Sequence, residues 1–204
     1  MKKIEINGKE YNIPQSLHEV SLKQYCKIFN GMKLDKDMEW KEIKYAESKM
    51  ISRIMGEDDE FALSLPLTVY NMLCEMCTFL YEAKHRKHND KVKLNGKYYT
   101  IPNPSDMNLR QWIDIDVTRQ SGSEDMFIEL YAILLCEIGE DGKVKEYDGK
   151  YEERIKPLED YPSDDAMSMI NDFFVKGESS QKLMDAYSKV EEAVNQFAHS
   201  TKGS

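Results

Sequence analysis

The chain has 204 residues, of which 41% are apolar and 32% are charged, a balance typical of a globular protein and too apolar for a disordered one. Acidic residues outnumber basic ones by 37 to 28, and the formal net charge of −9 argues against general binding to nucleic acid or to an anionic membrane surface. Apolar runs are only a few residues long, so no membrane span is predicted. Four cysteines without a secretory signal lead us to expect reduced thiols in a cytosolic compartment.

Two segments that begin 88 residues apart carry nearly the same pattern. Residues 4–14 read IEINGKEYNIP and residues 92–102 read VKLNGKYYTIP, with six identical positions. After a shift of one residue, Glu19–Tyr25 aligns with Asp106–Trp112, and every pair in that alignment is chemically similar. We interpret this self-similarity as a tandem duplication.

The start of each copy predicts a β-hairpin. Alternating apolar residues flank Asn7-Gly8 in the first copy and Asn95-Gly96 in the second. Both residue types tolerate the positive φ that a type I′ turn requires, and Asn-Gly is the strongest short hairpin signal. Pro14 ends the second strand of its hairpin because proline cannot donate to a strand ladder.

Three helices are predicted after each hairpin. The first begins after an N-cap at Ser21 or Asn108. In the first copy, the second predicted helix is Trp40–Met55, which ends at Gly56, and the third runs from Pro66 to about residue 85. In the second copy, the corresponding helices are Glu124–Ile138, which ends at Gly139, and one that runs from Pro162 to about residue 175. We expect equivalent side chains to fill equivalent core positions, in the pairs Tyr11/Tyr99, Ile13/Ile101, Leu22/Leu109 and Tyr25/Trp112.

The predicted fold class is therefore α+β, with two tandem homologous modules, each a β-hairpin followed by three helices, plus a C-terminal helix. The predicted boundaries are residues 1–88 and 89–178 for the modules and 179–204 for the C-terminal helix and its polar tail.

The second module differs from the first in charge and in length. Residues 1–88 hold 14 basic and 14 acidic residues, whereas residues 89–204 hold 14 and 23. An insertion at about residues 143–153 has Asp148-Gly149 at its centre and is predicted to form an extra exposed hairpin. Its candidate interface residues are Tyr147, Asp148 and Tyr151.

The C-terminal helix is predicted to pack through one apolar seam. The 4-3-4-3 spacing of the seam is typical of a helix that packs on another helix. Its own module and a neighbouring subunit are both possible partners. These candidate interface residues are Leu183, Tyr187, Val190, Val194 and Phe197.

No catalytic, cofactor-binding or metal-ligating residue is predicted. Cys74-x-x-Cys77 and His85-x-x-His88 contain zinc-ligand types, but a continuous helix would spread them over roughly 16 Å, too far for one tetrahedral site. The histidines lie in no nucleophile signature, and the chain has no phosphate-binding glycine loop. We therefore expect no metal, no cofactor and no enzymatic activity.

One basic run stands at the junction of the two copies, with candidate contact residues Lys84, Arg86, Lys87 and Lys91. A solvated helix end is the ordinary interpretation, because cations suit a helix C-terminus. Docking to an acidic protein surface is the second, and nucleic-acid binding is the least favoured because interleaved aromatic residues are scarce.

The pattern INGKxYxIP at residues 6–14, followed by Glu19–Tyr25, residues 51–56 (ISRIMG) and residues 65–67 (LPL), resembles small morphogenesis proteins of tailed bacteriophages. The resemblance covers most of residues 4–80 and returns in weaker form over 92–175. It implies a non-enzymatic virion protein, a ring-forming component of the head–tail connector or tail, with other phage structural proteins as partners and a homo-oligomeric assembled state. The expected location is the virion, and the host cytoplasm during assembly. A soluble tail-assembly chaperone is the alternative, and a cytoplasmic enzyme or metal-binding regulator is the least favoured.

Overall fold

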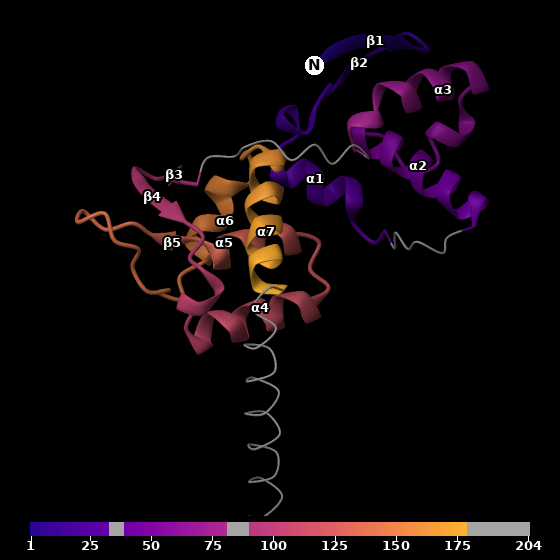
Figure 1. Cartoon of the computed structure of the whole chain (residues 1–204). Coiled ribbons are helices and arrows are strands. Elements are labelled where there is room, and N and C mark those ends of the chain that lie inside the picture. The colour runs from indigo at the N-terminus through magenta and orange to yellow at the C-terminus, as the bar shows by residue number, and fades with distance from the viewer. Residues whose placement is uncertain (33–38, 81–89, 179–204) are drawn as a thin grey trace, which may run out of the picture.

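The computed structural model describes residues 1–32, 39–80 and 90–178, and these ranges contain seven α-helices and two small antiparallel sheets. The predicted α+β class is thus confirmed. Figure 1 shows two lobes on either side of α1 (Leu22–Phe29). The first lobe contains β1 (Lys2–Ile6), β2 (Lys9–Ile13), α2 (Trp40–Ile54) and α3 (Leu67–Met76). The second lobe contains β3 (Val92–Leu94), β4 (Lys97–Thr100), α4 (Leu109–Ser121), α5 (Met126–Leu134), β5 (Cys136–Glu137), α6 (Glu152–Leu158) and α7 (Ser163–Glu178).

Both predicted hairpins are confirmed. β1 pairs with β2 and β3 pairs with β4, each around a two-residue Asn-Gly turn. The φ angles are +52° and +78° at Asn7 and Gly8, and +50° and +82° at Asn95 and Gly96. Positive φ at both turn residues is the signature of the type I′ turn, whose twist matches that of the flanking strands.

The two sheets differ by one strand. β5 pairs antiparallel with β4, with Thr100 opposite Cys136, so the second sheet has the order β3-β4-β5, whereas the first has two strands. The predicted helix over Glu124–Ile138 is therefore wrong at its end: α5 stops at Leu134 and the chain enters β5. Gly139 does not cap a helix; its N–H instead donates to the Lys143 carbonyl at 2.8 Å.

The predicted helix starts are confirmed. Ser21 accepts a hydrogen bond from the Gln24 N–H at 3.2 Å, and Asn108 accepts one from the Gln111 N–H at 3.0 Å. Gly56, with φ of +73°, follows the last turn of α2. α3 ends at Met76 and a short 3₁₀ turn continues to Leu80, so the rest of the predicted helix lies outside the described residues.

Each lobe has its own hydrophobic core, and α1 contributes to both. Ile28 belongs to the core of the first lobe, together with Ile13, Ile51 and Leu73. Leu22 and Cys26 belong instead to the core of the second lobe, which is built mainly from β3, α5 and α7. α1 therefore buries one part of its surface on each side.

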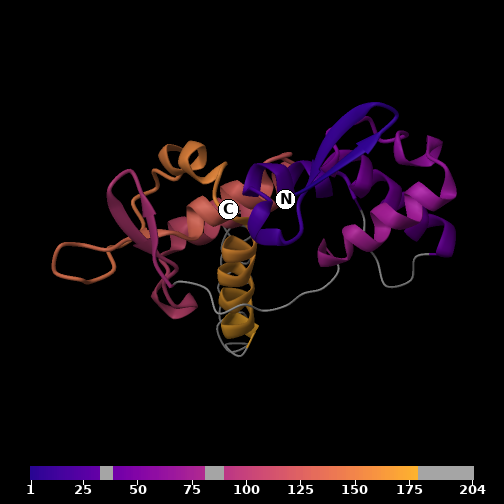
Figure 2. The same ribbon diagram turned by 90° about the horizontal axis from the view of Figure 1, so that it is seen from above.

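Backbone and side-chain hydrogen bonds join the lobes where α1 meets the start of α7. The N–H of Leu22 donates to the Tyr161 carbonyl at 2.8 Å, and the N–H of Ser163 donates to the Val20 carbonyl at 2.9 Å. Lys23 extends from α1 to the Asp125 carboxylate at 2.8 Å. Figure 2, the view from above, shows α7 on the side of the second lobe that faces the first.

The expected burial of Leu109 is wrong. Leu22 is fully buried, whereas Leu109, the residue after the equivalent N-cap, is 61% exposed. α4 faces its core through Gln111, Ile115 and Thr118. The other expected pairs hold in part: Tyr11 and Ile13 are buried, whereas Tyr99, Ile101, Tyr25 and Trp112 are partly buried against the cores.

The predicted hairpin at 143–153 is also wrong. The chain turns earlier, at Gly142 with φ of +77°, and an isolated bridge pairs Ile138 with Val144. Gly149 makes a separate turn with φ of +74°, and α6 begins at Glu152. The insertion therefore consists of a turn, an irregular segment and the start of a helix. Tyr147, which was expected on the surface of a hairpin, is buried in the core instead.

Candidate functional site

The predicted interface residues of the insertion contact their own lobe. Tyr147 is 7% exposed, and its hydroxyl donates to Asp114 Oδ2 at 2.8 Å. Burial, with the nearby Asp114 carboxylate, raises the pKa of Tyr147. Tyr151 is half-buried against the same core, and Asp148 accepts a hydrogen bond from Arg154. Of the three, only Asp148 is exposed, and its carboxylate is already engaged.

Among the described residues, Arg154 is the one charged side chain that is buried, and it organises this region. Nη1 donates to the Leu135 carbonyl at 2.9 Å, and Nη2 donates to Asp148 Oδ1 at 2.5 Å. The guanidinium lies 5.5 Å from the ring centroid of Tyr99 and 5.9 Å from that of Tyr147, within the range of cation–π attraction. Burial raises the pKa of Asp148, but the Lys150 N–H and the Arg154 charge outweigh it, so the pKa stays below its ordinary value.

Glu137 anchors the turn that follows β5. Lys145 approaches one of its carboxylate oxygens at 2.5 Å and Lys97 the other at 2.7 Å. These two ammonium groups lower the pKa of Glu137 from 4.5 to about 2. The carboxylate is therefore a structural clamp between β4, β5 and the inserted segment.

The basic junction and the C-terminal seam fall mostly outside the described residues. Lys91 is exposed just before β3. Lys84, Arg86 and Lys87 lie outside the described residues, as do Leu183, Tyr187, Val190, Val194 and Phe197. Those contact predictions stay predictions.

The cysteines described in the structure are free thiols. Cys74 and Cys77 lie at the end of α3, and burial raises the pKa of Cys77 to about 12 and that of Cys26 to about 11. Thiols that are protonated at neutral pH are weak nucleophiles and weak metal ligands. His85 and His88 lie outside the described residues, so the expected absence of a zinc site stays a prediction.

One group of metal-ligand types does come together at the lobe junction. His18, Asp164 and Asp165 place donor atoms within 4.8 Å of one another, and His18 Nδ1 lies 3.2 Å from Asp164 Oδ1. A nitrogen with two carboxylate oxygens suits several divalent metals. However, Asp164 also accepts the Asp165 N–H at 2.9 Å in the first turn of α7, where acidic residues stabilise a helix without any metal. We assign the group to the contact between the lobes.

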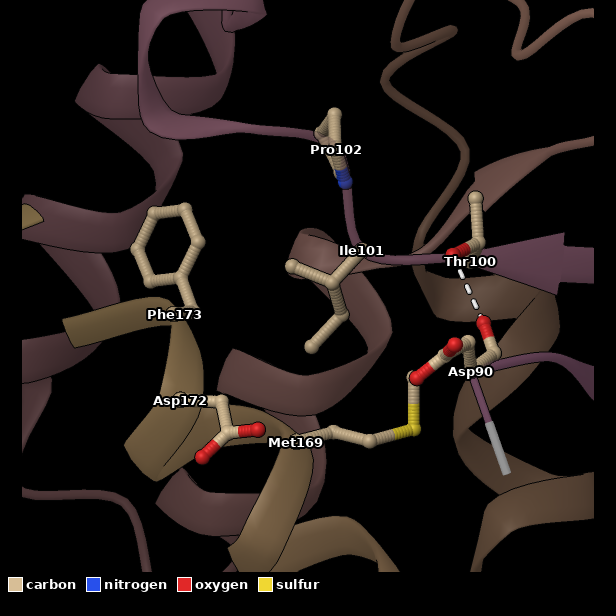
Figure 3. Close-up of a pocket in the computed structure, with 7 residues that line it drawn as sticks. All are labelled: Asp90, Thr100, Ile101, Pro102, Met169, Asp172 and Phe173. Atoms are coloured by element: carbon tan, nitrogen blue, oxygen red, sulfur yellow. Dashed lines mark hydrogen bonds between the residues drawn. The ribbon is translucent and has the colours of Figure 1, made fainter. Parts of the chain in front are cut away.

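A small cavity lies between the end of β4 and α7. Its volume is about 190 Å³, below the roughly 300–1,000 Å³ of most small-molecule sites. Figure 3 shows Ile101, Met169 and Phe173 around it, and Thr100 donating to the Asp90 carbonyl at 2.7 Å. Pro102 and Asp172 complete the lining. The lining brings together two carboxylates and an apolar wall, without a paired nucleophile and base.

The outer edge of β2 is open. Ile6 and Lys9 close the turn as a hydrogen-bonded pair, so the alternation of the ladder directs the backbone groups of Glu10 and Asn12 away from β1. In the second sheet the residue that corresponds to Glu10 is Tyr98, and its carbonyl accepts the Ile138 N–H at 2.7 Å. Among the described residues, no backbone hydrogen bond fills the Glu10–Asn12 edge.

Large apolar side chains are also exposed on three helices. Trp40 at the start of α2 is 74% exposed, and Leu67 at the start of α3 is 71% exposed. On α4, Leu109, Ile113 and Val117 form a row of exposed side chains spaced four residues apart. Sequence reasoning missed this row because it placed Leu109 in the core, although the i, i+4, i+8 spacing of the three residues was visible.

The comparisons with known proteins identify no relative. No family model, no curated protein and no solved structure matches the chain. Within the described ranges, none of the helices combines the length and the apolar character needed to cross a membrane.

Proposed function

We propose that this chain is a non-enzymatic structural or assembly protein of a tailed bacteriophage, a ring-forming component of the head–tail connector or tail made of two homologous modules. The phage assignment rests on the resemblance of residues 4–80 to phage morphogenesis proteins. The duplication is supported by the two type I′ hairpins and by the helix N-caps that follow them at Ser21 and Asn108.

The observation that carries a role in protein contact is the open edge of β2. An unpaired strand edge invites another strand, and soluble proteins usually cover or shorten such edges. In this chain β5 covers the equivalent edge of the second hairpin, whereas Glu10 and Asn12 leave the first one open. A strand from a neighbouring subunit or a partner protein would complete the first sheet by β-augmentation.

A proline at the open edge tests this role. Asn12→Pro removes one outward N–H without breaking a bond to β1, because Asn12 lies at a non-hydrogen-bonded position. We expect the variant to stay folded and to lose assembly with phage neck or tail proteins in light scattering. Asn12→Thr, which keeps the N–H, is the control. Unchanged assembly of the proline variant would remove this edge from the interface.

A soluble tail-assembly chaperone remains the second candidate, because an open edge serves a transient client as well as a permanent neighbour. Peptide mass spectrometry of purified particles separates the two roles. A virion component is present in the particle, and a chaperone is present only in the lysate of infected cells. If the chain is absent from the purified particles and also from the complexes of unassembled neck or tail proteins in the lysate, both roles are contradicted.

A further inference from the structure

The row of apolar side chains on α4 points away from the core of the second lobe. Leu109, Ile113 and Val117 are 61%, 51% and 62% exposed. At about 100° per residue, their mean direction is nearly opposite to that of Gln111, Ile115 and Thr118, which are buried. α4 therefore buries one face in its lobe and carries large apolar side chains on the opposite face, where solvent would favour polar ones, a pattern typical of a helix that is covered on both sides. We name Leu109, Ile113 and Val117 the outer stripe.

The chain itself supplies a matching surface close to α4. Phe173 of α7 packs against Trp112 of α4, with ring centroids 6.4 Å apart, and Figure 1 shows the described part of α7 running down to α4. The 26 residues 179–204 follow α7, and their sequence carries one apolar seam. Ala186 and Ala193 flank the seam and allow a close approach of backbones. The seam residues are Leu183, Tyr187, Val190, Val194 and Phe197.

The connection is long enough for the seam to reach the outer stripe of the same chain. The described part of α7 reaches Glu178, and four residues, 179–182, lie between it and Leu183 in the sequence. Four residues in extended form span up to about 13 Å, which is more than the roughly 10 Å diameter of a helix. The segment can therefore pass from the flank of α4 that touches Phe173 to its outer face.

Two physical effects favour the segment of the same chain over that of a second copy. A short tether holds the segment at an effective concentration on the order of millimolar, far above that of a dilute second chain. In addition, residues 89–204 carry 14 basic and 23 acidic residues, so two copies of this half repel each other. We propose that residues 183–197 pack across the outer stripe of α4 in the same chain and cover Leu109, Ile113 and Val117.

Thiol labelling at the centre of the outer stripe tests this packing. The centre is covered whether residues 183–197 run parallel or antiparallel to α4. Ile113→Cys is introduced into the full chain and into a chain that ends at residue 178, and the native cysteines provide the background rate. We expect labelling to be at least about tenfold slower in the full chain, as for a site that reacts only after local opening. Asp141→Cys, in an exposed turn of the same lobe, should react equally fast in both chains. Equal labelling rates of the Ile113→Cys variant in the full and shortened chains would overturn the proposal.

Two further measurements identify the occupant. Val190→Asp in the full-length Ile113→Cys chain should raise the labelling rate to that of the shortened chain, whereas Ser188→Asp, which lies outside the seam, should not. Protection by the same chain is independent of protein concentration. Protection that grows with concentration would assign the stripe to a second copy and overturn the proposal. The test needs no phage component, so its failure is separate from failure of the proposed function.

Discussion

Arg154 Nη2 lies 2.5 Å from Asp148 Oδ1, and this contact closes the irregular segment of the insertion over the core of the second lobe. The guanidinium is nearly fully buried, and its other contacts are the Leu135 carbonyl and two tyrosine rings. Asp148 is only partly screened from water. The arginine therefore links the carboxylate of the inserted segment to the backbone and the aromatic rings of the core.

We expect Arg154→Met to lower the free energy of unfolding by about 2–3 kcal/mol, because it leaves the buried Leu135 carbonyl without a donor. Asp148→Asn should cost about 1–2 kcal/mol, because the buried guanidinium loses its counter-charge although the amide oxygen can still accept its hydrogen bond. Urea unfolding measures both. The matched control is Lys156→Met on the exposed side of α6, with an effect within about 0.5 kcal/mol. Equal losses for the two methionine variants would contradict the role of Arg154.

Glu137 predicts a pH dependence in the acid range. The folded state lowers the pKa of Glu137 from 4.5 to about 2, so its contribution to stability is complete above pH 4.5 and is lost as the pH falls toward 2. Glu137→Gln should therefore reduce the steepness with which the urea midpoint falls between pH 4.5 and 2. Glu140→Gln, in the exposed turn nearby, is the control. If the urea midpoint of Glu137→Gln falls with pH as steeply as that of the wild type, the two lysines do not lower the pKa of Glu137 in the protein in solution.

Two glycines with similar φ angles separate backbone strain from a side-chain contact. Gly149 has φ of +74° and Gly142 has φ of +77°, so alanine should cost about 1–2 kcal/mol at either position. A Cβ at Gly149 would also overlap the Arg110 guanidinium, whereas nothing lies within 4 Å at Gly142. Because this guanidinium is the mobile end of an exposed side chain and can move aside, we expect Gly149→Ala and Gly142→Ala to lose similar stability in thermal unfolding. A larger loss at Gly149 that disappears when Arg110→Ala is added would show instead that Arg110 is held in place.

Leu22 predicts that the two lobes unfold together. It is fully buried in the core of the second lobe, while Ile28 of the same helix is buried in that of the first. Leu22→Ala should cost about 2–5 kcal/mol. Leu63→Ala, at a residue that is 45% exposed, is the control and should cost less than about 1 kcal/mol.

Two probes show whether the transition is shared. In a Trp40→Phe chain, Trp112 fluorescence reports on α4 in the second lobe, and far-UV circular dichroism reports on the helices of both lobes. We expect coincident urea midpoints, with Leu22→Ala moving both by the same amount. Two separate transitions would mean that α1 does not couple the cores.

Local signals in the sequence predicted the parts of the fold that depend on neighbouring residues. Asn-Gly determines the backbone of both hairpins, and Ser21 and Asn108 bond to N–H groups three residues ahead. β5 could not be predicted in this way, because Cys136 is extended only through its pairing with Thr100, 36 positions earlier. α6 was missed because it is short and contains Pro157, a residue that normally argues against a helix.

The error at Leu109 has a similar cause. The N-cap defines where α4 begins but not which of its faces meets the core, because that face is set by α5 and α7, which come later in the chain. Since α4 carries apolar residues on two faces, hydrophobic periodicity does not distinguish the inner one from the outer one. The prediction that the insertion is a contact surface failed for the same reason, since the hydroxyl of the buried Tyr147 donates to Asp114 of α4.

Because α1 belongs to both cores, the protein does not divide cleanly into two independent pieces at the link between its lobes. Cutting the chain between residues 81 and 89 would leave the C-terminal fragment with an empty space where Leu22 and Cys26 pack, and with the Tyr161 carbonyl and the Ser163 N–H unpaired. We therefore expect the C-terminal fragment not to fold by itself. A synthetic peptide spanning residues 14–30 has the side chains and backbone groups to restore the C-terminal fragment, so the fold is suited to complementation from separate pieces.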